Sequence, residues 1–223
     1  GPDAARALAA REDAPMGHDP TGARAEYDAW RRPRATPGDL RLEDVVAHLD
    51  DVLPDDAILT NGAGNYAAFL HRYYRWKAPR TQLAPTSGSM GYGLPAAIAA
   101  SIEVPDRDVI CLAGDGCLQM TVNEMSTAIQ HGAHPVVIVC DNGRYGTIRM
   151  HQEKHYPGRV SGTDLTNPDF AALARAYGGA GWTVRVQDEF APALAAARVC
   201  GMLAVIHLHL DPRMLSTGAD LPG

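Results

Sequence analysis

Short apolar runs alternate with amphipathic segments along most of the chain. Two runs, residues 108–114 and 135–140, are rich in β-branched residues and hardly alternate with polar ones, which is typical of strands covered on both faces. Further strands are predicted at 57–60, 81–85, 181–186 and 202–210, and helices at 42–53, 65–76, 94–104, 119–132, 167–179 and 189–199. This alternation favours an α/β fold: a doubly wound, mostly parallel sheet with helices on both faces.

Capping signals and composition suggest the domain limits. Asn167 is the predicted N-cap of its helix, with Pro168 at the first helical position and Gly178 after the end. Residues 1–40 carry several prolines and glycines and no sustained apolar period, so we expect a linker or tail with a short helix near residues 24–30. One domain is expected over residues 41–212, followed by a C-terminal tail over residues 213–223.

Composition and charge narrow the class of protein. The chain has 223 residues, of which 46% are hydrophobic, and a formal net charge of -6. We therefore expect no nucleic-acid partner and no membrane partner, because there is no cluster of basic residues and no apolar stretch of about 18 residues. No secretory signal is recognised, so a cytoplasmic location is expected. The cysteines lack metal-site spacing and are interpreted as free thiols; they are Cys111, Cys117, Cys140 and Cys200.

Two polar residues follow the two central predicted strands. Asp115 comes directly after one strand, and Asn142, 27 residues later, follows the next. One helix and one strand fit between them, so a right-handed crossover would bring both to the carboxyl edge of the sheet, where such sheets bind ligands. Carboxylate and amide oxygens suit Mg²⁺ together with phosphate oxygens. Gly114, Gly116 and Gly143 would let the backbone approach a phosphate.

Each half of this pattern has a simpler explanation. Gly-Asp-Gly alone is a weak signal, and Asn-Gly is an ordinary turn dipeptide. The two together, each after a buried strand and one crossover apart, favour a metal–diphosphate site.

The same residues resemble a known family. The Gly114-Asp115-Gly116 sequence, followed by Asn142 in "CDNGRYGTIR", is similar to the thiamine diphosphate motif, which begins GDG and closes on two asparagines. The segment "SGSMGYGLPAAIAA" (87–100) resembles the part of acetolactate synthases and benzoylformate decarboxylases that holds the middle of the cofactor. The resemblance covers residues 41–211 and implies a thiamine diphosphate-binding fold.

The resemblance implies a role for each matching residue. Mg²⁺ would be held by the side chains of Asp115 and Asn142 and by the backbone carbonyl of Arg144. Met90 would be the apolar wedge that folds the cofactor, and the Gly88 carbonyl would accept a hydrogen bond from its aminopyrimidine. The other expected cofactor-binding residues are Gly62, Ala63, Gly64, Asn65, Ser89, Gly114, Gly116, Cys117, Tyr145, Gly146 and Thr147, with Gly116 and Cys117 giving backbone N–H groups to the diphosphate.

Taken alone, two of these residues have ordinary structural readings. Met90 would be a core methionine beside a helix start, and Cys117 a small buried thiol. Two departures from the family pattern also matter. Asp141 stands in place of the first of the paired asparagines and adds a carboxylate near the expected diphosphate. The "NGAGN" loop at 61–65 lacks the Gln-His of many acetolactate synthases.

The family also uses a glutamate that contacts the pyrimidine ring, from a separate domain usually supplied by a neighbouring chain. We find no such domain here, and Glu124 is interpreted as a helix-surface or capping residue. We therefore expect no catalytic residue in this chain, a pyrimidine-binding domain from a missing N-terminal part or a partner chain, and a homo-oligomer. A C-terminal fragment of a longer enzyme, inactive alone, is favoured over a natural subunit.

Several other residues invite a functional reading. "HQEKH" (151–155) lacks the glutamate of a zinc metalloprotease helix, and a solvated helix face is favoured over a mobile segment above the active site. His207 and His209 alternate on a strand and are expected at the surface. Arg144, Arg149, Lys154 and Arg159 form a possible cationic rim for 2-oxo acids or simply a solvated charged face.

The expected function is that of an acetolactate synthase-like enzyme that decarboxylates and joins 2-oxo acids with thiamine diphosphate and Mg²⁺. The alternatives are a 2-oxo acid decarboxylase of the benzoylformate type and a catalytically silent α/β interaction module.

Overall fold

The computed structural model describes residues 20–220, in two compact units that divide between Arg32 and Pro33. Residues 1–19 of the predicted tail and residues 221–223 lie outside the described residues. The first unit contains α2 (Pro20–Trp30), a helix that includes the short one predicted near residues 24–30. An ion pair of 3.2 Å between Arg24 and Asp28 links successive turns of α2.

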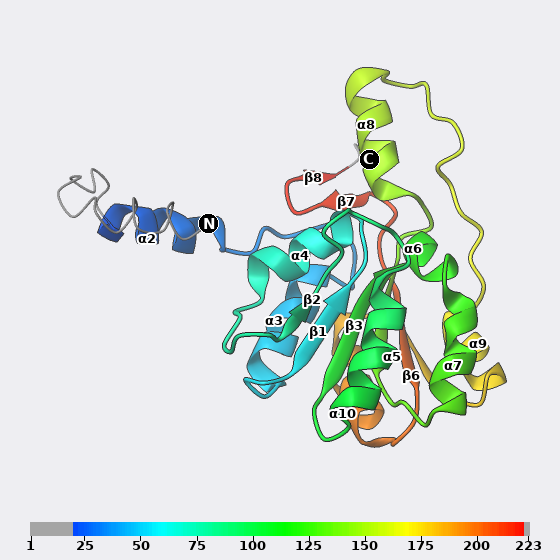
Figure 1. Cartoon of the computed structure of the whole chain (residues 1–223). Coiled ribbons are helices and arrows are strands. Elements are labelled where there is room, and N and C mark those ends of the chain that lie inside the picture. The colour runs from blue at the N-terminus through cyan, green and yellow to red at the C-terminus, as the bar shows by residue number, and fades with distance from the viewer. Residues whose placement is uncertain (1–19, 221–223) are drawn as a thin grey trace, which may run out of the picture. The chain divides into compact units, whose positions relative to one another are not determined.

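The second unit is built on a six-stranded sheet in which all neighbouring strands are parallel (Figure 1). The strands lie in the order β2, β1, β3, β4, β6, β5. Their bounds are Ile58–Asn61 for β1, Gln82–Leu83 for β2, Val109–Gly114 for β3, Val136–Asp141 for β4, Ala180–Val184 for β5 and Ala204–His209 for β6. The predicted α/β class and all the predicted strands are confirmed.

Helices cover both faces of the sheet and enclose two hydrophobic cores (Figure 1). One core lies beneath α3 (Leu42–Val52), α4 (Asn65–Tyr73) and α10 (Phe190–Val199), and the other beneath α5 (Gly93–Glu103), α7 (Met125–Gln130) and α9 (Phe170–Ala176). Side chains of β3 alternate between the cores: Ile110 and Leu112 enter the first, Cys111 and Ala113 the second. Both faces of the strand are therefore apolar, which explains its unbroken hydrophobic run.

The helix predicted over residues 119–132 is interrupted. The chain instead forms α6 (Asp115–Gln119), the 3-10 helix η1 (Val122–Glu124) and then α7. Thr121 leaves the helical conformation between α6 and η1, and its hydroxyl donates a 2.8 Å hydrogen bond to the Gly91 carbonyl. This hydrogen bond holds Thr121 against the segment that contains Gly91, at the point where the helical run is broken.

The start of α9 also differs from the prediction. Asp169 is the N-cap, and its carboxylate accepts a hydrogen bond from the Ala172 N–H. The predicted capping role of Asn167 is wrong, because its amide is engaged at the sheet edge described below.

Beyond the carboxyl edge of the sheet, α8 (Gly146–His155) stands beside the hairpin of β7 (Met214–Ser216) and β8 (Ala219–Asp220) (Figure 1). The predicted limits at residues 41 and 212 fall inside the second unit. Thr36 is buried, and its hydroxyl donates a 2.7 Å hydrogen bond to Glu43. Met214 and Leu215 are buried as well. No helix within residues 20–220 has the length and hydropathy that crossing a bilayer requires.

Candidate functional site

The ends of β3 and β4 lie side by side at the carboxyl edge of the sheet. The strand register pairs Gly114 with Cys140, so Asp115 and Asn142 enter neighbouring loops. A 3.1 Å hydrogen bond from the Gly143 N–H to Asp115 Oδ2 joins these loops. The crossover thus brings together the two segments in which metal ligands are predicted.

Asp115 is a buried carboxylate, with 4% of its surface exposed. Its Oδ1 accepts a hydrogen bond from the Gly116 N–H and its Oδ2 accepts one from the Asn167 amide, both at 2.8 Å. Among residues 20–220, no Lys, Arg or His forms an ion pair with it. Burial, opposed by these hydrogen bonds and assisted by the charge of Asp141, raises the pKa of Asp115 to about 6.

Asp141 lies next to Asp115 but has a basic partner. Its Oδ2 is 2.8 Å from His207 Nε2, while its Oδ1 accepts hydrogen bonds from the Gly143 N–H at 2.9 Å and the Asn167 amide at 2.7 Å. Burial alone would raise the pKa of Asp141, but hydrogen bonds from His207, Asn167 and Gly143 lower it below its usual value.

The expected surface position of His207 is wrong. Only 2% of His207 is exposed, because α9 covers this face of the sheet and the Phe170 ring packs edge-on against the imidazole at 5.1 Å. His209, two residues further along β6, remains partly exposed. The amide of Asn167 bridges Asp115 and Asp141 and so belongs to the same network.

A pocket opens beside Asp115, with about 560 Å³ of space when the part open to solvent is included. Of the residues predicted to bind the cofactor or the metal, only Gly62, Gly88 and Ser89 are absent from its wall. The predicted residues that do line the pocket are Ala63, Gly64, Asn65, Met90, Gly114, Asp115, Gly116, Cys117, Asn142, Arg144, Tyr145, Gly146 and Thr147.

The three predicted residues outside the wall are either buried behind it or exposed to solvent. Gly62 lies behind the wall: a Cβ atom there would be 2.3 Å from the sulfur of Cys117, and its N–H donates to the Tyr66 hydroxyl at 3.1 Å. Gly88 and Ser89 are exposed, although the next residue, Met90, lines the pocket.

Two glycines keep room for aromatic rings at the pocket floor. A Cβ atom on Gly114 would lie 2.8 Å from the Tyr66 ring, and one on Gly116 would lie 2.5 Å from the Tyr145 ring. Both distances are too short for a carbon–carbon contact. A larger residue at Gly114 would clash with the buried Tyr66 ring, and one at Gly116 would force the partly exposed Tyr145 ring to move. The Gly116 N–H donates to Asp115, so a diphosphate would have to replace that hydrogen bond.

Sequence reasoning missed several residues of the wall, which are Tyr66, Cys140, Ile148, Met214 and Leu215. Tyr66 donates a 3.2 Å hydrogen bond to the sulfur of Cys117, and burial together with that thiol raises its pKa. It directly follows Asn65 in the predicted loop, so its position could have been inferred. Met214 gave no signal because it lies in the predicted tail, yet its carbonyl accepts the Asn142 amide N–H at 2.9 Å.

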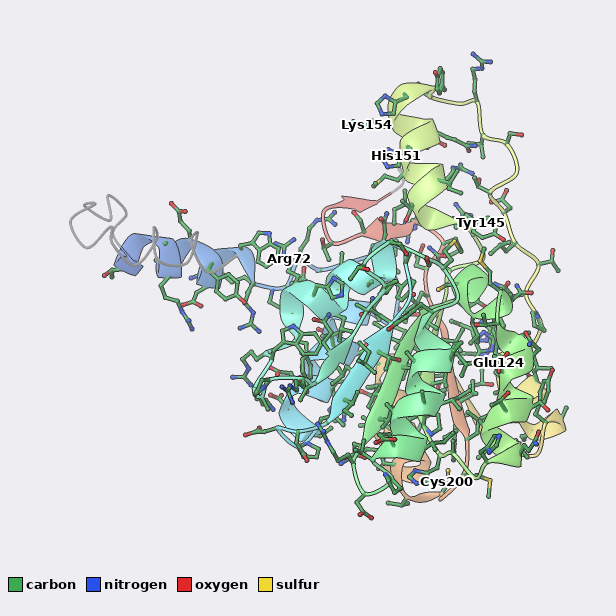
Figure 2. The ribbon with its side chains drawn as sticks, in the orientation of Figure 1. Arg72, Glu124, Tyr145, His151, Lys154 and Cys200 are labelled. Carbon is green, nitrogen blue, oxygen red and sulfur yellow. The ribbon has the colours of Figure 1, made fainter. Side chains whose placement is uncertain are left out.

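Two of the four basic residues of the possible rim, Arg144 and Arg149, form ion pairs. Arg144 Nη2 lies 3.8 Å from Asp164, and Arg149 Nη2 lies 2.9 Å from Glu153. Figure 2 shows Tyr145 at the base of α8, with His151 and Lys154 further along the helix beyond the sheet edge. His151 and His155 are exposed and stacked, with ring centroids 6.1 Å apart, which confirms the predicted solvated face.

Two residues lie apart from the pocket wall, as the sequence suggests. Glu124 occupies the N-cap position of α7, but its side chain makes no capping bond to a backbone N–H; its carboxylate accepts a 2.6 Å hydrogen bond from the Thr127 hydroxyl. The Cys200 side chain is at the end of the sheet opposite Tyr145 (Figure 2). All four cysteines are free thiols.

Comparison with known proteins connects this geometry to a family. Residues 62–208 match the family described as "Thiamine pyrophosphate enzyme, C-terminal TPP binding domain". The chain is 31% identical over 195 residues to the acetolactate synthase large subunit of Haemophilus influenzae, covering 83% of this chain and 34% of the relative. It is 36% identical over 169 residues to the Corynebacterium glutamicum large subunit, covering 73% and 27%.

Solved structures give the same result. A thiamine diphosphate-dependent 4-hydroxybenzoylformate decarboxylase from Rhodococcus jostii RHA1 superimposes with a TM-score of 0.75 at 28% identity, over 81% of this chain and 34% of that one. Benzoylformate decarboxylase from Polynucleobacter necessarius gives 0.74 at 26% identity, over 82% and 36%. The chain thus spans about a third of the length of these proteins. It belongs to the family of C-terminal TPP binding domains of thiamine pyrophosphate enzymes.

Proposed function

We propose that this chain holds the diphosphate end of thiamine diphosphate through Mg²⁺. The ligands would be the Asp115 carboxylate, the Asn142 amide oxygen and the Arg144 backbone carbonyl, all hard oxygen donors. The Asn142 nitrogen is engaged by the Met214 carbonyl, which leaves the amide oxygen for a metal. The main support is the buried Asp115 carboxylate at the pocket wall, which has no cationic partner among residues 20–220.

The other predicted residues would shape the cavity around the cofactor. Residues 62–65 would form the loop that grips the phosphates, and the Asn65 N–H donates a 3.1 Å hydrogen bond to the Thr147 hydroxyl across the pocket. Gly116 and Cys117 would offer N–H groups, with Tyr145 and Gly146 flanking the diphosphate. Met90 packs against the first core, as a fixed apolar wedge under the cofactor would require. Gly88 and Ser89 would contact the cofactor's middle.

The bound cofactor supplies the carbanion chemistry that 2-oxo acid conversion requires. The residues of this chain would orient it, and apolar side chains such as Met90 and Leu215 line the pocket. Burial of Asp115 contributes as well, because the attraction between a carboxylate and a cation is stronger where water is excluded.

For the whole enzyme we propose an acetolactate synthase-like activity, the decarboxylation and joining of 2-oxo acids. The names of the curated relatives support this assignment. The group that contacts the aminopyrimidine would come from a pyrimidine-binding domain outside this chain or from a partner chain, within a homo-oligomer. None of the residues of this chain is assigned a catalytic role.

A second candidate is a 2-oxo acid decarboxylase of the benzoylformate type. It is favoured by the structural similarity to two decarboxylases of that kind and by the "NGRYGTIR" segment. Both candidates require the same cofactor and metal. They differ from a silent interaction module, which would require neither.

Thermal unfolding with and without cofactor tests the proposal. Millimolar thiamine diphosphate with Mg²⁺ should raise the melting temperature, because a ligand that binds only the folded state stabilises it by mass action. The Asp115→Ala variant should fold but show no Mg²⁺-dependent shift, whereas Asp188→Asn, an exposed aspartate of η2 (Gln187–Glu189), should respond like the parent. The absence of a shift in the parent, or an undiminished shift in Asp115→Ala, would contradict the metal assignment.

A further inference from the structure

A second group of metal-ligating side chains lies on the sheet beside the Asp115 loop. Asp141 at the end of β4 is the cross-strand partner of His209 on β6, and His207 is two residues earlier on the same strand. Side chains two residues apart on a strand point to the same face. One ligand atom from each of these three residues lies within 4.8 Å of the others.

We propose that Asp141, His207 and His209 bind a divalent transition-metal ion of the zinc class, at a site separate from the Mg²⁺ clamp. Two imidazoles and one carboxylate are a donor set suited to Zn²⁺, whereas Mg²⁺ prefers oxygen ligands alone. None of the three residues belongs to the wall of the cofactor pocket. The proposal therefore does not depend on thiamine diphosphate binding.

The position of His207 fits a metal ligand in part. Its Nε2 is 2.8 Å from Asp141 Oδ2, so Nε2 is the nitrogen that would share a metal with this carboxylate. Its Nδ1 is buried and has no hydrogen-bond partner among the described residues, and Asp169 Oδ1, at 3.8 Å, is too far away to accept a hydrogen bond from it. Metal-ligating histidines commonly donate their second ring N–H to a carboxylate, and Asp169 is a carboxylate on that side of the ring.

The carboxylate ligand is also held in place. Asp141 Oδ1 accepts hydrogen bonds from the Gly143 N–H and the Asn167 amide, which leaves Oδ2 directed at His207. The Asn167 amide donates to Asp115 too, so a single side chain connects the two proposed metal sites.

His209 provides the entry to the site. It is partly exposed, whereas His207 is buried. A metal binds an imidazole in its neutral form. Three protein ligands leave a coordination position open for water or a small ligand, as in zinc sites that are not purely structural.

The alternative is that His207 and Asp141 form a hydrogen-bonded pair with no metal. In both arrangements Nδ1 of His207 is buried without a hydrogen-bond partner among the described residues, so this atom does not distinguish them. The two accounts differ for His209, which makes a ring contact with His207 at 4.2 Å but is needed as a ligand only if a metal binds.

Calorimetric titration of the tag-free chain with Zn²⁺, in excess Mg²⁺, tests the site. The parent should bind one Zn²⁺ per chain, and Co²⁺ should give the intense visible absorption of a low-coordinate nitrogen and oxygen site. His209→Ala should weaken the affinity for Zn²⁺ at least about tenfold, because even the loss of a residue that only orients a metal ligand has an effect of that size. His207→Gln should do the same, with its thermal melt recorded to verify folding.

A matched control is the double substitution of His151 and His155 by Ala, since this exposed pair on α8 is the other place where two imidazoles lie together in the described part of the chain. The control should retain the Zn²⁺ affinity of the parent. The proposal is overturned if the parent binds no stoichiometric Zn²⁺, or if binding survives in His209→Ala and is lost in the α8 variant.

Discussion

Two aspartates at the ends of adjacent strands show how different two similar carboxylates can be. Asp115 and Asp141 share the same two donors, the Gly143 N–H and the Asn167 amide. Only Asp141 has a basic partner, His207, and its pKa is lowered, whereas burial raises the pKa of Asp115 to about 6. In the structure, both oxygens of Asp141 have hydrogen-bond partners within the chain, one of them basic. Asp115, in the pocket wall, lacks the positive charge that a bound cation would bring.

The largest expected effect on stability comes from removing His207, the basic partner of Asp141. His207→Ala leaves Asp141 buried without its base and creates a cavity against Phe170, so we expect a loss of about 3–5 kcal/mol in the free energy of unfolding. Asp115→Asn, measured in the same denaturant titration without metal, should lose little or gain stability. Equal losses in the two variants would show that the carboxylates do not differ in this way.

The pH dependence of stability sharpens the same comparison. Below about pH 3 Asp115 is protonated in both the folded and the unfolded chain; as the pH rises toward 7, the unfolded chain ionises first, so this residue's contribution to stability is lost. Relative to Asp115→Asn, the metal-free parent should therefore lose about 2–3 kcal/mol over this interval. Urea titrations at a series of pH values measure the difference. A pH-independent difference would mean that the pKa of Asp115 is not raised.

Asn167→Ala should remove one hydrogen bond from each of the two carboxylates, because the Asn167 amide donates to both Asp115 and Asp141. We expect a loss of about 1–2 kcal/mol in the free energy of unfolding. Asn123→Ala is a suitable control, since the Asn123 amide is exposed and its hydrogen bond is to its neighbour Glu124. If the two variants are equally stable, the hydrogen bonds from Asn167 to Asp115 and Asp141 contribute nothing to the free energy of unfolding.

The smallest effect concerns the cap of α9. Asp169→Ala removes the side chain that accepts the Ala172 N–H and should cost about 1 kcal/mol. Asp169→Asn should restore most of this loss, because asparagine caps helices almost as well as aspartate. Thermal melts of the three proteins are sufficient; a failure of asparagine to rescue would indicate that Asp169 acts through His207 and not as a cap.

The strands and the loops that follow β3 and β4 were predictable because they depend on local patterns. The run over residues 108–114 is apolar throughout, and the polar residues Asp115 and Asn142 come where each strand ends. His207 was misplaced because alternation suggests a solvent face only when one face of a sheet is uncovered, and here helices cover both.

Asn167 was misassigned for a related reason. Asn167 and Asp169 both satisfy the local rule for a helix cap. The Asn167 amide instead donates hydrogen bonds to Asp115 and Asp141, which are 52 and 26 residues away in sequence. Contacts of this kind, like that between Asn142 and Met214, are formed by the tertiary fold and leave no local signal.

Electron paramagnetic resonance with Mn²⁺ in place of Mg²⁺ tests most directly whether Asp115 anchors a cofactor metal. The parent with thiamine diphosphate should bind one Mn²⁺ per chain, seen as loss of the free-ion signal, and Asp115→Asn should leave that signal at the level of free Mn²⁺. Equal Mn²⁺ binding by the parent and by Asp115→Asn would contradict the assignment of the unpaired carboxylate as the metal ligand.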